Sequence, residues 1–193
     1  MNRIARILAI AGALLLVFGA TAAARKATGT THSDKRPTAT RRMKEVNTRL
    51  YLTILTGKQL NKPGWPAFVP ANIVVPAHTW ITVEIRNFDH GTAPLLKGMT
   101  MYTRVEGTWG HEEEVDEHPV TSVPNAKISH TFTIPKLNIN APIPANSTVE
   151  FTFETPGPGV YTWNCMAPCG TGPTGMGGAM VTDGYMTGQL VVR

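Results

Sequence analysis

The chain has 193 residues, of which 42% are hydrophobic, and a formal net charge of +5 at neutral pH. These totals allow one domain of ordinary size with a real hydrophobic core. Ten of the 18 Lys and Arg residues lie at or before Arg49, whereas residues 51–193 carry eight basic and eleven acidic groups, a net charge of −3. The positive charge belongs to the N-terminal segment, so nucleic-acid binding by the folded part is not expected.

The first 24 residues have the pattern of an export signal. Two arginines precede an apolar run over residues 7–20, and small residues follow it up to Ala24. Cleavage after Ala22 or Ala24 would release the domain, whereas an uncleaved run over residues 7–24 is long enough to act as a membrane anchor. Both forms predict an extracytoplasmic location: secreted, periplasmic or at the cell surface, with the membrane as a partner if the N-terminal helix is retained.

After the signal, residues 25–45 contain almost nothing apolar to bury, and we predict a flexible basic linker there. The folded domain is expected over residues 46–193. This part shows no convincing amphipathic helix pattern, and 14 of the 15 prolines lie at Pro63 or later, between short segments of β-type composition. This succession of short β-type segments separated by prolines predicts an all-β domain built as a sandwich or a barrel.

The clearest predicted strand runs from Thr79 to Phe88, where apolar and polar residues alternate so that one face can be buried. Further strands are predicted at residues 49–56, 72–75, 130–134, 148–154, 160–164 and 189–192.

The stretch of about 91–128 breaks this rhythm and is too long for a hairpin loop, so we predict an insertion over one end of the sandwich. Its acidic run, residues 112–117, is interpreted as a solvated face. The alternative is a docking surface for a basic partner or a set of metal contacts that would comprise Met99, Met101, His111 and His118.

The residues that suggest chemistry lie near the C-terminus. Both cysteines of the chain, Cys165 and Cys169, lie in a Gly/Pro-rich loop among several methionines. Thiolate and thioether sulfur are soft ligands that favour copper, and a glycine-rich loop can fold them around one point. With His130 as an imidazole on a strand and Met176 as a weak thioether, the chain has the donors of a mononuclear copper site. In an exported protein, a Cys165–Cys169 disulfide is the competing explanation.

The order of these motifs resembles the copper-binding CuA domain of cytochrome c oxidase subunit II, a member of the cupredoxin superfamily. The resemblance covers about residues 72–192, with the insertion included. The matching pieces are HTFTIP from His130, IPAN from Ile143, the strand at 149–153, GVYTWNC ending at Cys165, and CGTGPTGM from Cys169 to Met176. The resemblance implies a cupredoxin-like Greek-key β-sandwich and one-electron transfer in a respiratory-type chain.

The resemblance also implies a metal-ligand set, which comprises His130, Cys165, Cys169, Met176 and, through its backbone carbonyl, Ala167. The second histidine of the family falls on Pro173, which has no side-chain donor. The usual two-copper centre therefore lacks one nitrogen unless His90, His118 or a histidine of another chain supplies it. Of these, His90 follows Asn87-Phe-Asp, which also resembles a cupredoxin strand end.

The leading hypothesis is an exported or membrane-tethered cupredoxin that binds copper and passes single electrons to a redox partner protein or respiratory oxidase. The surplus of methionines favours an alternative, a Cu(I) carrier or assembly factor for a respiratory copper enzyme. A metal-free module with a Cys165–Cys169 disulfide is the third reading. The chain shows no hydrolase signature and no phosphate-binding loop, so we expect neither a stand-alone enzyme nor a small-molecule substrate.

Overall fold

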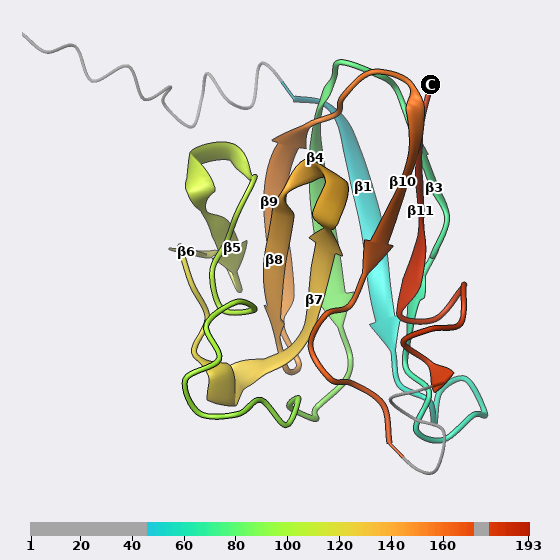
Figure 1. Ribbon diagram of the computed structural model, residues 1–193, viewed down its shortest axis with the longest axis vertical. Coiled ribbons are helices and arrows are strands. Elements are labelled where there is room, and N and C mark those ends of the chain that lie inside the picture. The colour runs from blue at the N-terminus through green and yellow to red at the C-terminus, as the bar shows by residue number, and fades with distance from the viewer. Residues whose placement is uncertain (1–45, 172–177) are drawn as a thin grey trace, which may run out of the picture. The chain divides into compact units, whose positions relative to one another are not determined.

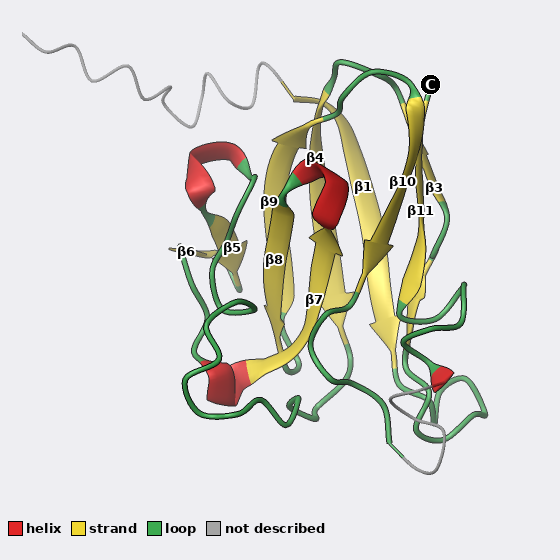
Figure 2. Cartoon of the chain, viewed as in Figure 1, coloured by secondary structure: helices red, strands yellow, loops and turns green. Residues whose placement is uncertain are grey.

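The computed structural model describes residues 46–171 and 178–193. The predicted signal or anchor helix and the linker, residues 1–45, lie outside the described part, as do Pro173 and Met176. Within the described ranges, no helix is long and apolar enough to cross a membrane. The helical turns η1 (Trp109–His111), η2 (Asn125–Lys127) and η3 (Pro135–Leu137) each have three residues (Figure 2).

The strands form two sheets that lie face to face (Figure 1). Sheet A has the order β2-β1-β4-β9-β5-β6, and its strands are β1 (Val46–Leu55), β2 (Ala67–Val69), β4 (Trp80–Asn87), β5 (Glu113–Val115), β6 (His118–Val120) and β9 (Thr148–Glu154). Sheet B has the order β3-β11-β10-β7-β8, and its strands are β3 (Ile73–Val75), β7 (Ile128–Ile134), β8 (Ile139–Pro144), β10 (Gly159–Asn164) and β11 (Thr187–Val192).

The core lies between the sheets and follows from the alternation in the sequence. In β4, the apolar residues Ile81, Val83 and Ile85 are each at most 1% exposed, and they oppose three buried residues of the antiparallel strand β9. On the other face of the same pair, Thr82 and Thr152 share a hydrogen bond of 2.9 Å between their hydroxyls. The period of two in the sequence therefore sets which face of sheet A is buried.

Strand pairing is mixed. The β1–β4 and β3–β11 pairs are parallel, whereas neighbours such as β4–β9, β7–β8 and β10–β11 are antiparallel. The chain crosses between the sheets several times, because sheet A takes β4, β5, β6 and β9 while sheet B takes the strands between and after them. This arrangement confirms the predicted all-β sandwich with a long insertion.

A cluster of aromatic rings fills the core next to the sulfur-bearing loop. Trp163 is fully buried and stacks on Phe132 at a centroid distance of 5.3 Å, while Phe68 meets the Trp163 ring edge-on at 4.8 Å. The indole Nε1–H of Trp163 donates a hydrogen bond of 2.8 Å to the carbonyl of Ala71, so its polar atom is satisfied inside the core. The residues that follow Trp163 therefore start from a fixed position.

The insertion corrects one expectation. Its strand β5 pairs with β9, with Glu114 opposite Glu150, and thereby adds two strands to sheet A. Because side chains alternate along a strand, Glu113 points to the opposite face from Glu114 and is only 1% exposed. The interpretation of the acidic run as a solvated face is therefore wrong for Glu113.

The Glu113 carboxyl is buried without compensation. Neither of its oxygens accepts a hydrogen bond from any residue that the structure describes. Burial raises the pKa of Glu113 to about 9, because the charged form would lose its hydration and gain nothing in return. The folded protein consequently carries this residue as the neutral acid at neutral pH.

The buried carboxyl of Glu113 should make the free energy of unfolding depend on pH. Its pKa is about 9 in the folded protein, compared with the ordinary value of 4.5 that applies to the unfolded chain. Its contribution to stability is therefore fully present below the lower value and is lost as the pH rises through the folded value. Glu113→Gln keeps the shape and cannot ionise, so it should raise the free energy of unfolding by roughly 1–3 kcal/mol near pH 8. Urea denaturation across the neutral and mildly alkaline range measures the difference.

The matched control is Glu117→Gln, because Glu117 is exposed in the turn that follows β5. This control should retain the pH dependence of the wild-type protein. Identical pH profiles for Glu113→Gln and the wild type would contradict the inward placement of Glu113.

Candidate metal centre

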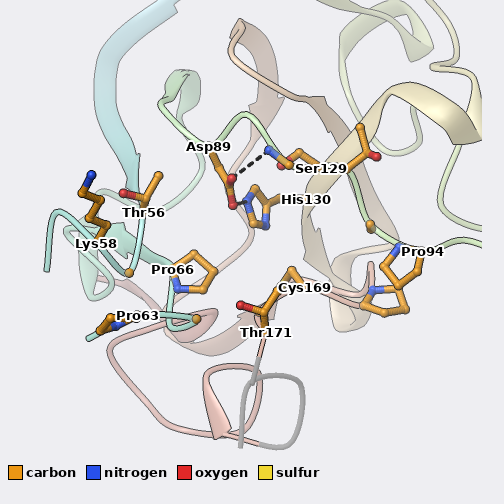
Figure 3. A pocket seen from close by; sticks show the side chains of 17 residues that line it. Thr56, Lys58, Pro63, Pro66, Asp89, Pro94, Ser129, His130, Cys169 and Thr171 are labelled. Atoms are coloured by element: carbon orange, nitrogen blue, oxygen red, sulfur yellow. Dashed lines mark hydrogen bonds and ion pairs between the residues drawn. The ribbon is translucent and has the colours of Figure 1, made fainter. Parts of the chain in front are cut away.

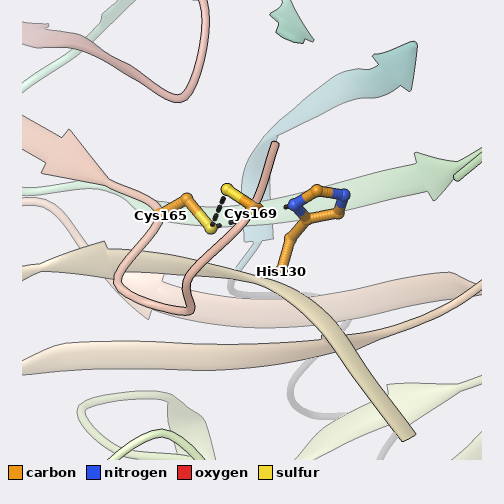
Figure 4. Close-up of side chains that lie close together, drawn as sticks. All are labelled: His130, Cys165 and Cys169. Atoms are coloured by element: carbon orange, nitrogen blue, oxygen red, sulfur yellow. Dashed lines mark hydrogen bonds between the residues drawn. The ribbon is translucent and has the colours of Figure 1, made fainter. Parts of the chain in front are cut away.

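Three predicted ligands meet at one end of the sandwich. His130 lies near the start of β7, Cys165 follows the last residue of β10, and Cys169 lies four residues further along the loop (Figure 4). The exposed fractions are 1% for His130, 1% for Cys165 and 5% for Cys169. The backbone N–H of Cys165 donates to the carbonyl of Met186 at 2.8 Å, which ties the loop to the segment before β11.

The donor atoms of these three residues are close enough to share one ion. All of them lie within 4.8 Å of one another. The Sγ atom of Cys165 is 3.8 Å from Nδ1 of His130 and 3.2 Å from Sγ of Cys169, and both cysteines are free thiols. One imidazole and two sulfurs make a compact, soft donor set, which could hold a metal ion without rearrangement of the backbone.

The two sulfurs have different environments. The backbone N–H of Thr131 donates to Sγ of Cys165 at 3.4 Å, and the thiol of Cys169 donates to the same atom. Burial alone would raise the pKa of the Cys165 thiol, but these hydrogen bonds and the His130 ring hold it well below its ordinary range. The hydrogen bond to Cys165, together with burial, raises the pKa of the Cys169 thiol. Cys165 is therefore the more acidic of the two thiols, and the Cys169 thiol donates to it.

Sequence reasoning missed the residue that orients His130, which is Asp89. Its Oδ2 atom lies 3.2 Å from Nε2 of His130 (Figure 3). Asp89 is itself fixed, because its N–H donates to Oδ1 of the buried Asn87 and its Oδ1 accepts from the N–H of Gly91, each at 2.9 Å. With Nε2 engaged by the carboxylate, Nδ1 of His130 is left to face the sulfurs.

The Asp89–His130 contact also sets the charge of the site. Burial lowers the pKa of His130, but the hydrogen bonds to Asp89 and Cys165 and their negative charges raise it to about 9. The hydrogen bond with His130 lowers the pKa of Asp89, although burial opposes this. At neutral pH the raised pKa favours the imidazolium form of His130, which has the Asp89 carboxylate on one side and the Cys165 sulfur on the other.

The structure does not bring His90 or His118 into this group. His90 is exposed, and its neighbour Asp89 makes the contact with His130 instead. His118 is exposed in β6 of the insertion, where its Nδ1 lies 2.7 Å from the carbonyl of Asp116. The carbonyl of Ala167 does lie at the site, 3.4 Å from Sγ of Cys165.

Two sequence candidates belong to the segment 172–177. Met176, expected as a thioether ligand, and Pro173, expected in the position of the second histidine, both lie outside the described residues. Among the residues that the structure describes, the cluster of His130, Cys165 and Cys169 is the one group of its kind with three metal-binding side chains.

No family model and no curated protein matches the chain. Among solved structures, auracyanin A, a "blue" copper protein from Chloroflexus aurantiacus, is 15% identical with a TM-score of 0.41 over 76% of this chain and 100% of that one. Auracyanin B is 15% identical with a TM-score of 0.37 over 77% and 90%. The Cu-containing nitrite reductase of Thermus scotoductus SA-01 is 13% identical with a TM-score of 0.40 over 76% and 31%. Likenesses at this level do not assign a function.

The contact between Asp89 and His130 predicts a graded effect of substitution. Asp89→Leu leaves the buried Nε2 of His130 without a partner, so metal affinity should fall by about 10–100-fold. Asp89→Asn can still accept the hydrogen bond and should lose less. Competition of the protein with a chromophoric Cu(I) chelator measures the affinities.

A second measurement separates orientation of the ring from a general loss of folding. In the metal-free wild type at neutral pH, nitrogen NMR should show His130 protonated at both ring nitrogens. Asp89→Leu should shift the loss of this form to lower pH, whereas Asp183→Leu should not. The control residue Asp183 is exposed. An unchanged imidazole signature in Asp89→Leu would refute the orienting role.

Proposed function

We propose that this protein binds copper through His130, Cys165 and Cys169 and transfers single electrons outside the cytoplasm. The observation that carries the proposal is the convergence of one buried imidazole and two buried sulfurs within 4.8 Å. Soft sulfur together with imidazole is a donor set that suits copper. Zinc accepts the same donors, so the identity of the metal is the first thing that an experiment must decide.

Electron transfer is supported by the rigidity of the frame. His130 lies within β7, and Cys165 directly follows β10 at the end of the Trp163–Phe132 stack. Ligands held by packed strands cannot rearrange freely when the metal changes its oxidation state, which suits a centre that must gain and lose one electron repeatedly. Such a centre hands electrons to another protein and needs no substrate pocket of its own.

The finer parts of the proposal rest on the sequence. They are Met176 as an additional ligand, the Ala167 carbonyl as a weak one, and a resemblance to the CuA domain that places the protein in a respiratory-type chain. Export or tethering through residues 1–24 supplies the extracytoplasmic location, with residues 46–193 as the copper-binding domain. A redox protein or respiratory oxidase is the proposed partner.

A Cu(I) carrier is the second candidate, and one observation favours it. Met166, next to the ligand Cys165, and Met101, from the insertion, line a common cavity of about 190 Å³. Their exposed fractions are 39% and 67%. Exposed thioethers beside a thiolate site suit the handling of Cu(I), although methionines also fill irregular gaps between loops.

Copper loading of the reduced protein tests the proposal. An electron-transfer centre should give an intense thiolate-to-Cu(II) absorption band and an electron paramagnetic resonance spectrum. Hyperfine coupling to a single copper nucleus indicates a mononuclear site, and coupling to two equivalent nuclei indicates a mixed-valence pair. Tight binding of Cu(I) without a stable Cu(II) signal favours the carrier. The proposal fails if the reduced protein binds zinc in preference and takes up no copper.

Single substitutions assign the signals to residues. Cys165→Ser should abolish the absorption band, because it removes the thiolate to which the Thr131 amide donates. Cys169→Ser should weaken copper binding and remove any two-copper signal. Equal spectra for the wild type and Cys165→Ser would mean that copper binds elsewhere.

Pro173→His tests the family resemblance of the loop. The substitution restores the imidazole that the CuA pattern has at this position, so a purple two-copper centre should form. Failure of Pro173→His to gain a two-copper spectrum, in a protein that still binds one copper, would mean that the loop does not follow that pattern.

A further inference from the structure

A cavity of about 350 Å³ lies directly beside the metal centre (Figure 3). Its walls come from three loops, over residues 56–66, 89–94 and 168–171, with the start of β7 at its base. His130 and Cys169 line this cavity, whereas Cys165 does not. The donor cluster therefore has one side that faces the core and one side that faces an opening.

The cavity has polar groups that the fold does not use. Lys58 lies on its lining as an exposed cation. The Oγ atom of Ser129 is buried at the cavity and makes no hydrogen bond within the described ranges. Much of the remaining wall is formed by glycines and prolines, which leave backbone and little side-chain bulk at the surface. The lining thus combines the cation of Lys58, the Cys169 thiol and, just beneath the surface, the hydroxyl of Ser129, which lacks a partner among the described residues.

The size of the cavity limits what can enter. Its volume of about 350 Å³ is at the lower end of the range for small-ligand pockets, about 300–1,000 Å³. A folded metallochaperone cannot place its own metal site inside such a space. A small organic molecule that carries the metal can reach Cys169.

From these observations we propose that the cavity is the loading port of the centre and takes a small, carboxylate-bearing thiol complex of Cu(I). The inference rests on the proposed function, since it concerns delivery of the copper that the site binds. Lys58 attracts the carboxylate of the carrier, and Ser129 offers a hydrogen bond to its polar backbone. Cys169, the sulfur on the cavity side, makes the first bond to the arriving metal.

The exchange balances without an oxidant or a reductant. The Cys169 thiol loses its proton and bonds to Cu(I) through sulfur, while one carrier thiolate leaves the metal and takes up a proton. Copper stays Cu(I) throughout. His130 and Cys165, which already lie within reach of the same point, then replace the remaining carrier ligand. The second carrier thiolate leaves the metal and takes up the proton that Nδ1 of His130 gives up on binding Cu(I).

Loading kinetics with Cu(I)–glutathione as the donor test the port. Thr92→Trp places a bulky ring at the exposed lining residue Thr92, and Thr121→Trp makes the same change at an exposed site in the insertion. Thr92→Trp should slow loading by at least about tenfold and leave the equilibrium affinity for Cu(I) unchanged, because it spares every ligand. Thr121→Trp should load at the wild-type rate.

A charge reversal tests the nature of the carrier. Lys58→Glu should slow loading from the anionic Cu(I)–glutathione complex by about tenfold, with a smaller effect at high salt. It should not slow loading from the cationic Cu(I)–acetonitrile complex. The control is Lys97→Glu, at an exposed lysine that does not line the cavity.

The outcomes separate this inference from the proposed function. A protein that binds no copper overturns both. Normal copper spectra with equal loading rates for the wild type and Thr92→Trp overturn the port and leave the proposed function intact. Equal effects of Lys58→Glu on the anionic and cationic donors overturn the assignment of an anionic carrier.

Discussion

The arrangement of the centre depends on one hydrogen-bonded chain, which runs from Asn87 through Asp89 and His130 to Cys165. An imidazole and two thiols buried together would be costly if their polar atoms had no partners. Here each of these atoms has a partner. The side chain of Asn87 accepts from the N–H of Asp89, the Asp89 carboxylate contacts Nε2 of His130, and Nδ1 of the ring faces Sγ of Cys165. Asn87 is the last residue of β4 in sheet A, whereas His130 lies on β7 and Cys165 follows β10, both strands of sheet B. This series of hydrogen bonds therefore links the two sheets.

The sequence predicted the strands that alternate most regularly. Residues 148–154 were expected as a strand and form β9 with the same bounds, and the 79–88 pattern gives β4. Strand β8 was not predicted, because Pro142 and Pro144 argue against a strand interior. It is an edge strand of sheet B, where missing N–H donors are tolerated. The short strands β2, β5 and β6 have only three residues each, too few for a recognisable period.

The candidate site was predictable where chemistry depends on residue type, and unpredictable where it depends on contacts. Histidine and cysteine are recognisable as metal ligands from residue type alone, so His130, Cys165 and Cys169 could be selected from the sequence. The structure brings these three side chains together. Asp89 has no feature in the sequence that marks it as part of the site. The Asn-x-Asp motif that it completes led us to expect the following residue, His90, as the ligand. Asp89 is half-buried against His130 and His90 is exposed, and the sequence does not reveal which of the two neighbours makes the contact. The burial of Glu113 was not predicted for a similar reason. A run of acidic residues does not reveal which of them lies on the inward face of a strand.

The hydrogen bond from the Thr131 amide to Sγ of Cys165 would affect the reduction potential of a metal bound there. A hydrogen bond to a ligating sulfur withdraws electron density from it, which favours the reduced metal and raises the reduction potential. The donor here is a main-chain group, so its strength is fixed by the path of β7 rather than by the identity of a side chain. Most substitutions at position 131 would keep it, and proline alone would remove it. This one contribution to the environment of the sulfur is thus set by the backbone and can persist when the side chain at position 131 changes.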